Sequence, residues 1–110
     1  MSSDLNILGI CRRANKLSMG HDACKDSVRS RKACVCLISK ESSDRVFNEF
    51  ENLCKQYGVE LKKVDLSIEE LSRITGYKAG ILTVNDPGFA GSVMKNLNQT
   101  TFAEVEAYDK

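Results

Sequence analysis

The 110-residue chain has little of what a metal centre or a membrane span requires. It contains one histidine, His21, and its five cysteines form no CxxC pair, so a ligand set of the tetrahedral zinc type is missing. No apolar run approaches the roughly 20 residues that a membrane helix needs. Internal repeats and low-complexity linkers are also missing from the sequence. We therefore expect no metal, no cofactor and no membrane partner.

The cysteines are predicted to be structural and reduced. Their number is odd, and the first apolar residues have the pattern of an amphipathic helix rather than a signal peptide, which predicts a cytoplasmic protein. Cys11, Cys24 and Cys54 fall at apolar helical positions, where a free cysteine behaves as a small hydrophobe. Cys34 and Cys36 are two residues apart on a predicted strand, which places both on one face.

Length and composition predict a single domain over residues 1–98, followed by a polar tail over residues 99–110 that ends acidic. The net charge of +1 would by itself argue against nucleic acid, but its distribution is uneven. Residues 1–40 carry eight Lys and Arg against three Asp and Glu, whereas residues 41–110 carry eight against twelve. A protein with one basic working face shows such an asymmetry, which is also compatible with chance.

The hydrophobic periodicity predicts helices that alternate with short strands. Strands are expected at 17–19, 33–38, 59–64 and 80–84. Helices are expected at about 4–13 with Asp4 as N-cap, at 21–30, from the cap at 42–44 to Gly58, from the capping box at 67–70 to Gly76, and from Asp86 and Pro87 to about Leu97. This alternation predicts an α/β fold, a three-layer α-β-α sandwich with a small mixed sheet.

Residues 12–32 hold most of the clustered positive charge and a glycine turn. Gly20 lies where the chain must bend into a helix, and glycine tolerates the positive φ that such bends often need. The first amides of that helix have no partner within it, so its start can hold a phosphate group. These features indicate an RNA-facing edge; a solvated helix with ordinary surface charge is the alternative.

A second turn, residues 85–88, precedes the last predicted helix. Both this turn and the turn from Lys16 to Gly20 are expected at carboxyl ends of strands, where ligands bind in α/β sheets. We therefore predict that the two turns lie together. A plain helix start is the alternative interpretation of the second turn.

The segment LGICRRANKLSMGHDACKDSVRSRKACVCLIS, followed later by DPGFA, resembles the kink-turn-binding ribosomal protein superfamily of the L7Ae and L30e type. More narrowly, it resembles the bacterial YlxQ-like branch of that superfamily. The resemblance covers about residues 5–97. It implies an α-β-α sandwich that binds RNA, with the site at the start of the second helix and in the loop before the last helix.

The chain departs from this family where RNA contacts are made. Kink-turn binders of the family typically follow the turn glycine with Asn or Lys two residues on, then Glu or Gln, then Thr, with a Lys at the sixth place. Here those positions hold Asp22, Ala23, Cys24 and Asp26. Ala23 cannot bond a base edge, and Asp26 places a carboxylate where the family has a phosphate-binding lysine. The resemblance thus implies RNA binding without standard kink-turn specificity.

Our hypothesis from the sequence is a small, non-enzymatic, ribosomal-protein-like RNA-binding protein. Its expected partners are ribosomal or other structured RNA and ribosome-associated proteins, with no small-molecule substrate. The predicted RNA-binding residues are Arg13, Lys16, Gly20, His21, Asp22, Lys25, Asp86 and Gly88. The three cations would contact the RNA backbone, and the amides of the two turns would frame it.

Two alternatives remain open at this stage. The acidic second half supports a protein-interaction module on the same fold that has lost RNA binding. The one catalytic candidate is a pair formed by His21 and Cys24, three residues apart at a helix start, where a thiol pKa is lowered. Such a dyad needs an orienting acid, and Asp22 is the one residue nearby of that type.

Overall fold

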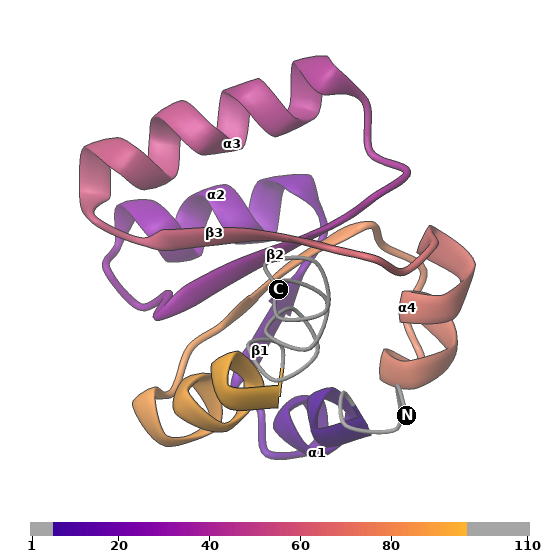
Figure 1. Cartoon of the computed structure of the whole chain (residues 1–110). Helices are drawn as coiled ribbons and strands as arrows, with labels where there is room; N and C mark the ends of the chain where they lie inside the picture. The colour runs from indigo at the N-terminus through magenta and orange to yellow at the C-terminus, as the bar shows by residue number, and fades with distance from the viewer. Residues whose placement is uncertain (1–5, 97–110) are drawn as a thin grey trace, which may run out of the picture.

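A four-stranded mixed sheet separates two groups of helices (Figure 1). This computed structural model describes residues 6–96. The strands are β1 (Leu17–Met19), β2 (Val35–Ser39), β3 (Glu60–Val64) and β4 (Ile81–Val84). Their order across the sheet is β1-β4-β2-β3, with β2 and β3 parallel and the two pairings of β4 antiparallel.

The helices divide between the two faces of the sheet. They are α1 (Ile7–Arg13), α2 (His21–Arg29), α3 (Asp44–Tyr57), α4 (Ile68–Thr75) and a last helix over residues 87–96. The helices α2 and α3 pack on one face, and α1, α4 and the last helix pack on the other (Figure 1). The predicted three-layer α-β-α sandwich with a small mixed sheet is therefore confirmed.

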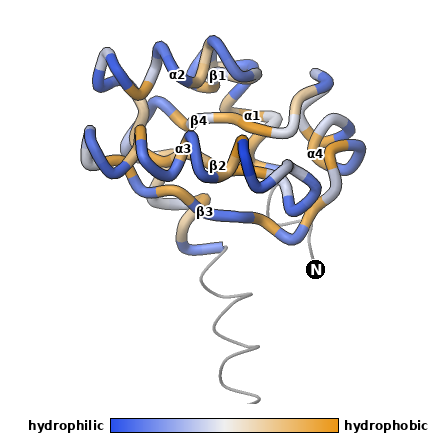
Figure 2. The backbone as a smooth tube through the Cα atoms, turned by 90° about the horizontal axis from the view of Figure 1, so that it is seen from above, coloured by the Kyte–Doolittle hydropathy of each residue, from blue (hydrophilic) through white to orange (hydrophobic). Residues whose placement is uncertain are grey.

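The central strand β2 supplies side chains to both cores. Val35 and Leu37 pack with α1 and α4, whereas Cys36 and Ile38 pack with α2 and α3. All five residues of β2 are buried, which is why this segment is a continuous apolar run rather than an alternating one. Figure 2 shows the central strands β2 and β4 as hydrophobic, whereas β3 and the outer turns of the helices include hydrophilic residues.

Side-chain caps and glycines set the ends of α3 and α4 where the sequence predicted them. The Ser43 hydroxyl accepts the Val46 amide at the start of α3. At the start of α4, Ser67 and Glu70 form a reciprocal capping box. Gly58 and Gly76 end these helices with φ of 71° and 81°, in the left-handed region that favours glycine.

Some expected boundaries and burials are wrong. The strand predicted from residue 33 begins at Val35, so Cys34 precedes it and is exposed while Cys36 is buried. In α1, Ile10 is 48% exposed and therefore lies outside the core.

Other expectations concern residues that the structure does not describe. Asp4 as N-cap, Leu97 as the approximate end of the last helix and the polar tail over 99–110 lie outside residues 6–96. Within the described part of the chain, no helix combines the length and the apolar character needed to cross a membrane.

The capping box gives a direct stability test. Changing Ser67 to Ala removes the hydroxyl that accepts the Glu70 amide at 3.0 Å, and we expect the free energy of unfolding to fall by about 1 kcal/mol. Urea denaturation should show this loss with an unchanged m-value. Ser92→Ala, at an exposed position of the last helix, is the matched control and should not destabilise the protein. Equal losses in both variants would contradict the role of the box.

Candidate nucleic-acid interface

The start of α2 is the first of two places where predicted site residues lie. We use this name for Gly20, His21, Asp22 and Lys25. Gly20 occupies the N-cap with φ 97° and ψ 161°, and its amide donates to the Ile81 carbonyl at 3.0 Å. No side chain caps this helix, so its first amides face outward as the sequence indicated.

Glu49 of α3 holds both basic side chains at the start of α2. His21 Nε2 lies 3.0 Å from Glu49 Oε1, and the Lys25 ammonium pairs with Glu49 Oε2. Hydrogen bonds from Lys25 and then His21 hold the pKa of the Glu49 carboxyl below its usual range. The His21 ring also packs edge-on against Phe50, with the centroids 5.2 Å apart. Two residues predicted to face RNA are thus turned toward α3.

The remaining charges at the start of α2 are negative. Asp22 is fully exposed beside His21, and Asp26 is exposed one turn further on. With Glu49 included, this region carries three carboxylates and the single ammonium of Lys25, which Glu49 pairs. An acidic residue near a helix start stabilises the helix, but it opposes the approach of a phosphate group.

The pairing of β1 with β4 separates the two predicted turns. At one end of this strand pair, the backbone amide of Asn85 donates to the Lys16 carbonyl at 2.8 Å. At the other end, the backbone amide of Gly20 donates to the Ile81 carbonyl. The turn that contains Asp86 therefore lies beside Lys16 and not beside Gly20. Because β1 runs antiparallel to β4, its carboxyl end meets the amino end of β4. The prediction that both turns lie together is wrong for Gly20 and holds for Lys16.

At the second turn, Asp86 is used within the protein. Its carboxylate accepts the Phe89 amide at 3.0 Å and caps the last helix, which begins at Pro87. Gly88 is exposed in the first turn of that helix, and Arg13 is exposed at the end of α1. Lys16 and Arg13 are therefore the predicted cations that form no ion pair in the described chain.

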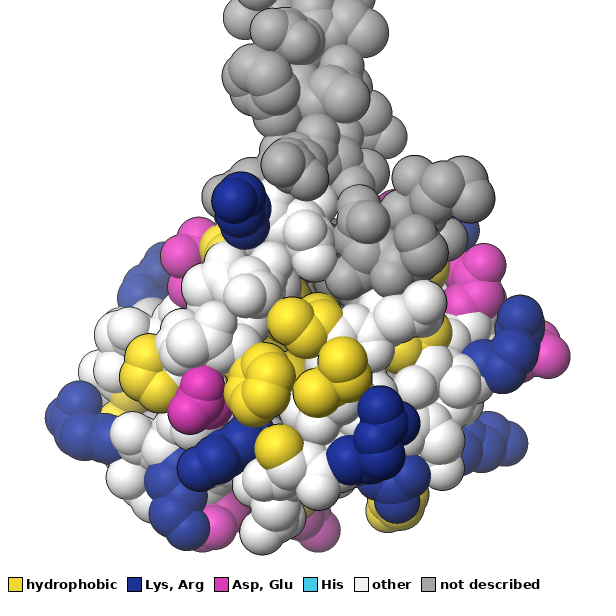
Figure 3. Space-filling model, turned by 90° about the horizontal axis from the view of Figure 1, so that it is seen from below, with side chains coloured by type: hydrophobic (Ala, Val, Ile, Leu, Met, Phe, Trp, Pro, Cys, Tyr) yellow, Lys and Arg dark blue, Asp and Glu magenta, His cyan; other side chains and the backbone are white. Residues whose placement is uncertain are grey.

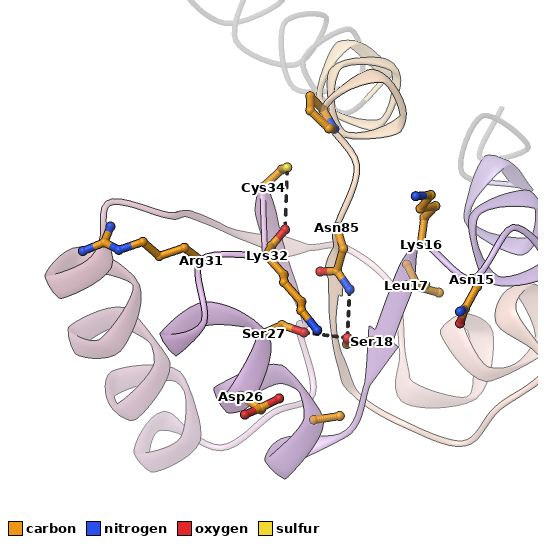
Figure 4. Close-up of a pocket in the computed structure, with 12 residues that line it drawn as sticks. Asn15, Lys16, Leu17, Ser18, Asp26, Ser27, Arg31, Lys32, Cys34 and Asn85 are labelled. Carbon is orange, nitrogen blue, oxygen red and sulfur yellow. Dashed lines mark hydrogen bonds between the residues drawn. The ribbon is translucent and has the colours of Figure 1, made fainter.

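A pocket of about 630 Å³ opens between three loops beside Lys16 (Figure 4). We call it the loop pocket. The loops are those after α1, after α2 and after β4, and one side of α2 completes the wall. The lining residues are Asn15, Lys16, Leu17, Ser18, Ala23, Asp26, Ser27, Arg31, Lys32, Cys34, Asn85 and Pro87.

A chain of hydrogen bonds runs along the wall of the loop pocket. The Asn85 Nδ2 group donates to Ser18 Oγ at 2.9 Å, and Ser18 Oγ lies 2.6 Å from Ser27 Oγ (Figure 4). On the other side, the buried Thr83 hydroxyl donates to Asn85 Oδ1 at 2.9 Å. These two bonds hold the Asn85 side chain in place against β1.

Two helix ends place lysines at the loop pocket. Asn15 and Arg31 follow α1 and α2 with φ of 62° and 64°, and they are the two non-glycine residues with positive φ in the described chain. The backbone amide of the following residue donates a hydrogen bond back into each helix. Lys16 donates to the Cys11 carbonyl at 2.8 Å, and Lys32 donates to the Ser27 carbonyl at 2.9 Å. Both ends have the bonding of a Schellman motif. Lys32 and Asn85 were not among the RNA-binding residues predicted from the sequence, although a basic residue follows the ends of both α1 and α2.

The catalytic pair considered from the sequence is not assembled. Cys24 is fully buried, its thiol donates to the Ser18 carbonyl at 3.5 Å, and burial raises its pKa to about 12. A nucleophilic thiol needs the opposite shift, and the His21 ring bonds Glu49 instead. In residues 6–96, no three His, Cys, Asp or Glu side chains gather where they could hold a metal ion.

The sequence matches a known family across the fold just described. Residues 6–94 match the family described as "Ribosomal protein L7Ae/L30e/S12e/Gadd45 family". The chain belongs to this family. It is also similar to the "RNA-binding protein YlxQ" of Bacillus subtilis (strain 168), with 30% identity over 93 residues, which cover 84% of this chain and 92% of that protein.

Solved structures share the architecture of this L7Ae/L30e/S12e/Gadd45 family member. One is "a protein with unknown function from Bacillus halodurans C", with a TM-score of 0.83 and 20% identity over 89% of this chain and 99% of that chain. Another is the "Giardia lamblia 15.5kD RNA binding protein", with a TM-score of 0.74 and 14% identity over 89% of this chain and 85% of that one. At these identities the likeness shows the fold.

Thiol reactivity tests the cysteine environments. Cys34 is exposed and the other four cysteines are buried, so an alkylating reagent should modify one thiol in the native protein and five after unfolding. Burial, and then the Asp86 charge, raise the pKa of Cys34, so the native reaction should accelerate as the pH rises above the ordinary thiol range. Mass spectrometry of the modified protein measures both counts. In Cys34→Ser the native reaction should vanish; a second fast thiol would show that a core cysteine is accessible.

Proposed function

We propose that this protein binds RNA through exposed cations and does so without standard kink-turn specificity. The observation that carries the proposal is the near full-length similarity to a Bacillus subtilis protein whose name is RNA-binding protein YlxQ. Membership of the L7Ae/L30e/S12e/Gadd45 family supports the same conclusion. We extend the proposal to ribosomal or other structured RNA as the ligand, to the cytoplasm as the compartment and to a non-enzymatic role.

The cations at the end of α1 and around the loop pocket support RNA binding. In the described chain, no carboxylate lies within 4 Å of the ammonium groups of Lys16 and Lys32. Arg13 is likewise exposed and outside every ion pair of residues 6–96. Unpaired cations release no internal partner when they meet a phosphate, so their full charge is available to the RNA backbone.

The start of α2 supports the loss of kink-turn specificity. Asp22, Ala23 and Asp26 are all exposed, so each would face RNA docked on this end of the helix. Two carboxylates there would repel phosphates, and Ala23 offers no hydrogen bond to a base edge. Lys25 does not offset them, because Glu49 already balances its charge.

A protein-interaction module remains the second candidate. It is favoured by an apolar group of side chains on the face that carries α1 and the last helix, beside several Lys and Arg side chains (Figure 3). Ile10 of α1 is 48% exposed and is the one large aliphatic residue of the described chain that is exposed. Isolated exposed hydrophobic residues are common, so an interface needs the contiguous patch rather than Ile10 alone.

The salt dependence of binding discriminates the two candidates. If three or four cations neutralise phosphates, the slope of log affinity against log salt should be about −2 to −4. Arg13→Ala and Lys16→Ala should each flatten the slope by about one unit. Fluorescence anisotropy with a labelled structured RNA at four salt concentrations measures the slopes.

The control for this experiment is Lys55→Ala, which removes an exposed lysine of α3 that is not among the predicted RNA contacts. Its slope should equal that of the unmodified protein. If affinity does not depend on salt, or if no RNA is retained at low salt, the protein-interaction candidate is favoured.

A triple substitution tests whether kink-turn specificity was lost at the start of α2. Asp22→Asn, Ala23→Glu and Asp26→Lys together add base-edge bonds and replace a repelled carboxylate by a phosphate partner. We expect tighter binding to a kink-turn RNA by on the order of 2–4 kcal/mol, with coupling among these neighbouring positions. Titrations at one salt concentration compare the kink-turn RNA with a straight duplex of equal length.

Asp26→Ala alone is the control, since it removes the carboxylate without adding a donor to a phosphate. An equal gain for both RNAs would mean that only charge had changed. No gain in a folded triple variant would place the RNA site away from the start of α2.

A further inference from the structure

We infer that the loop pocket binds a single unpaired nucleotide, with the base edge on the Asn85 amide and the phosphate between Lys16 and Lys32. The inference rests on the proposed function for its choice of ligand source, an unpaired nucleotide of an RNA strand. A free nucleotide has the same chemistry, and the experiment below separates the two. The site lies along one side of α2, from Ala23 to the loop after the helix, beside the end of β1 next to Lys16.

The Asn85 amide is presented as a fixed hydrogen-bonding group. An asparagine amide has two N–H donors and an oxygen that accepts two bonds. Ser18 takes one donor and Thr83 fills one acceptor site, which holds the amide in place and leaves one donor and one acceptor site on it. A donor beside an acceptor is what the edge of a nucleobase offers in return, and asparagine pairs with adenine in this way.

The charges around the loop pocket select an anionic ligand. Lys16 and Lys32 are unpaired in the described chain, whereas Asp26 is the single acidic residue in the wall. Figure 4 shows the Lys32 side chain reaching across the pocket toward Ser18 and Ser27. The Arg31 guanidinium points away and lies over the Tyr57 ring, 5.5 Å from its centroid. Two lysines from separate loops therefore provide the phosphate contacts.

The backbone of the loop pocket carries conformations that are otherwise avoided. Asn15 and Arg31, the two non-glycine residues of residues 6–96 with positive φ, both line it. A bulky side chain such as arginine is disfavoured there, and the Schellman bonds of the two helix ends hold both residues in this conformation. Here they set the directions in which Lys16 and Lys32 leave their helices.

The pocket has the volume of a small-molecule site. At about 630 Å³ it falls within the usual range for such sites, of about 300–1,000 Å³. A nucleotide joins a flat polar edge to an anion, and the loop pocket holds a fixed amide and two ammonium groups around one space. A ligand that lacks the polar edge leaves the amide without a partner, and a ligand that lacks the anion leaves the two ammonium groups without one.

Cys34 gives a local reporter, because it is exposed and lines the loop pocket. The experiment measures the alkylation rate of Cys34 in the native protein with adenosine monophosphate, ribose 5-phosphate, single-stranded oligoadenylate or a blunt duplex. We expect saturable protection by adenosine monophosphate, by oligoadenylate or by both, and weaker protection by ribose 5-phosphate. If adenosine monophosphate protects Cys34 and oligoadenylate does not, the pocket is assigned to free nucleotides. If oligoadenylate protects Cys34 and adenosine monophosphate does not, the pocket is assigned to RNA.

Two variants and one control locate the contacts. Lys32→Ala should weaken protection about tenfold, as expected for loss of one charge-assisted bond. Asn85→Ala should remove the preference for adenosine monophosphate over ribose 5-phosphate. Lys55→Ala, on α3, should leave protection unchanged.

Several outcomes overturn the inference. They are no protection by any nucleotide, equal protection by ribose 5-phosphate and adenosine monophosphate, or equal effects of Lys32→Ala and Lys55→Ala. If a separate measurement shows RNA binding but RNA does not protect Cys34, the loop pocket is not the binding site and the proposed function stands. Protection of Cys34 by a free nucleotide, in a protein that binds no RNA, would overturn the proposed function and leave the loop pocket standing as a nucleotide site.

Discussion

The antiparallel pairing of β1 with β4 is the constraint on which the arrangement of this protein's surface depends. Three residues of β1 connect the end of α1 to the start of α2, and their pairing fixes each of these helix termini at a different end of β4. The same pairing places Lys16 against Asn85 and thereby forms one wall of the loop pocket. A register shift by one residue would exchange the faces of Leu17 and Ser18 and would disrupt both the core and the polar wall.

The charged residues at the two ends of α2 are of the signs that stabilise a helix. Asp22 lies in its first turn and Arg29 in its last, so each complements the partial charge of the nearer terminus. This order gives the two ends opposite surroundings, acidic at the start and basic at the loop after the end. The basic count of the first forty residues therefore describes a real cluster, but it does not say at which end of the helix that cluster lies.

Local signals in the sequence predicted most of the fold. Ser43, Ser67, Gly58 and Gly76 act through neighbours a few residues away, so their caps follow from sequence spacing. The site was harder to predict, because its partners are distant in the chain: Glu49 meets His21 across 28 residues, and Asn85 meets Ser18 across 67. Periodicity carries no information about such pairs.

The bridge from Glu49 to Lys25 has a consequence for any anion that approaches the start of α2. Lys25 already has a counterion, and that counterion is covalently part of the protein. A phosphate that reached this lysine would exchange one anion for another and set no mobile ion free. The entropy that usually drives polyanion binding would be missing there. Glu49 thus acts as a permanent competitor, and the pKa held below its usual range keeps it ionised at neutral pH.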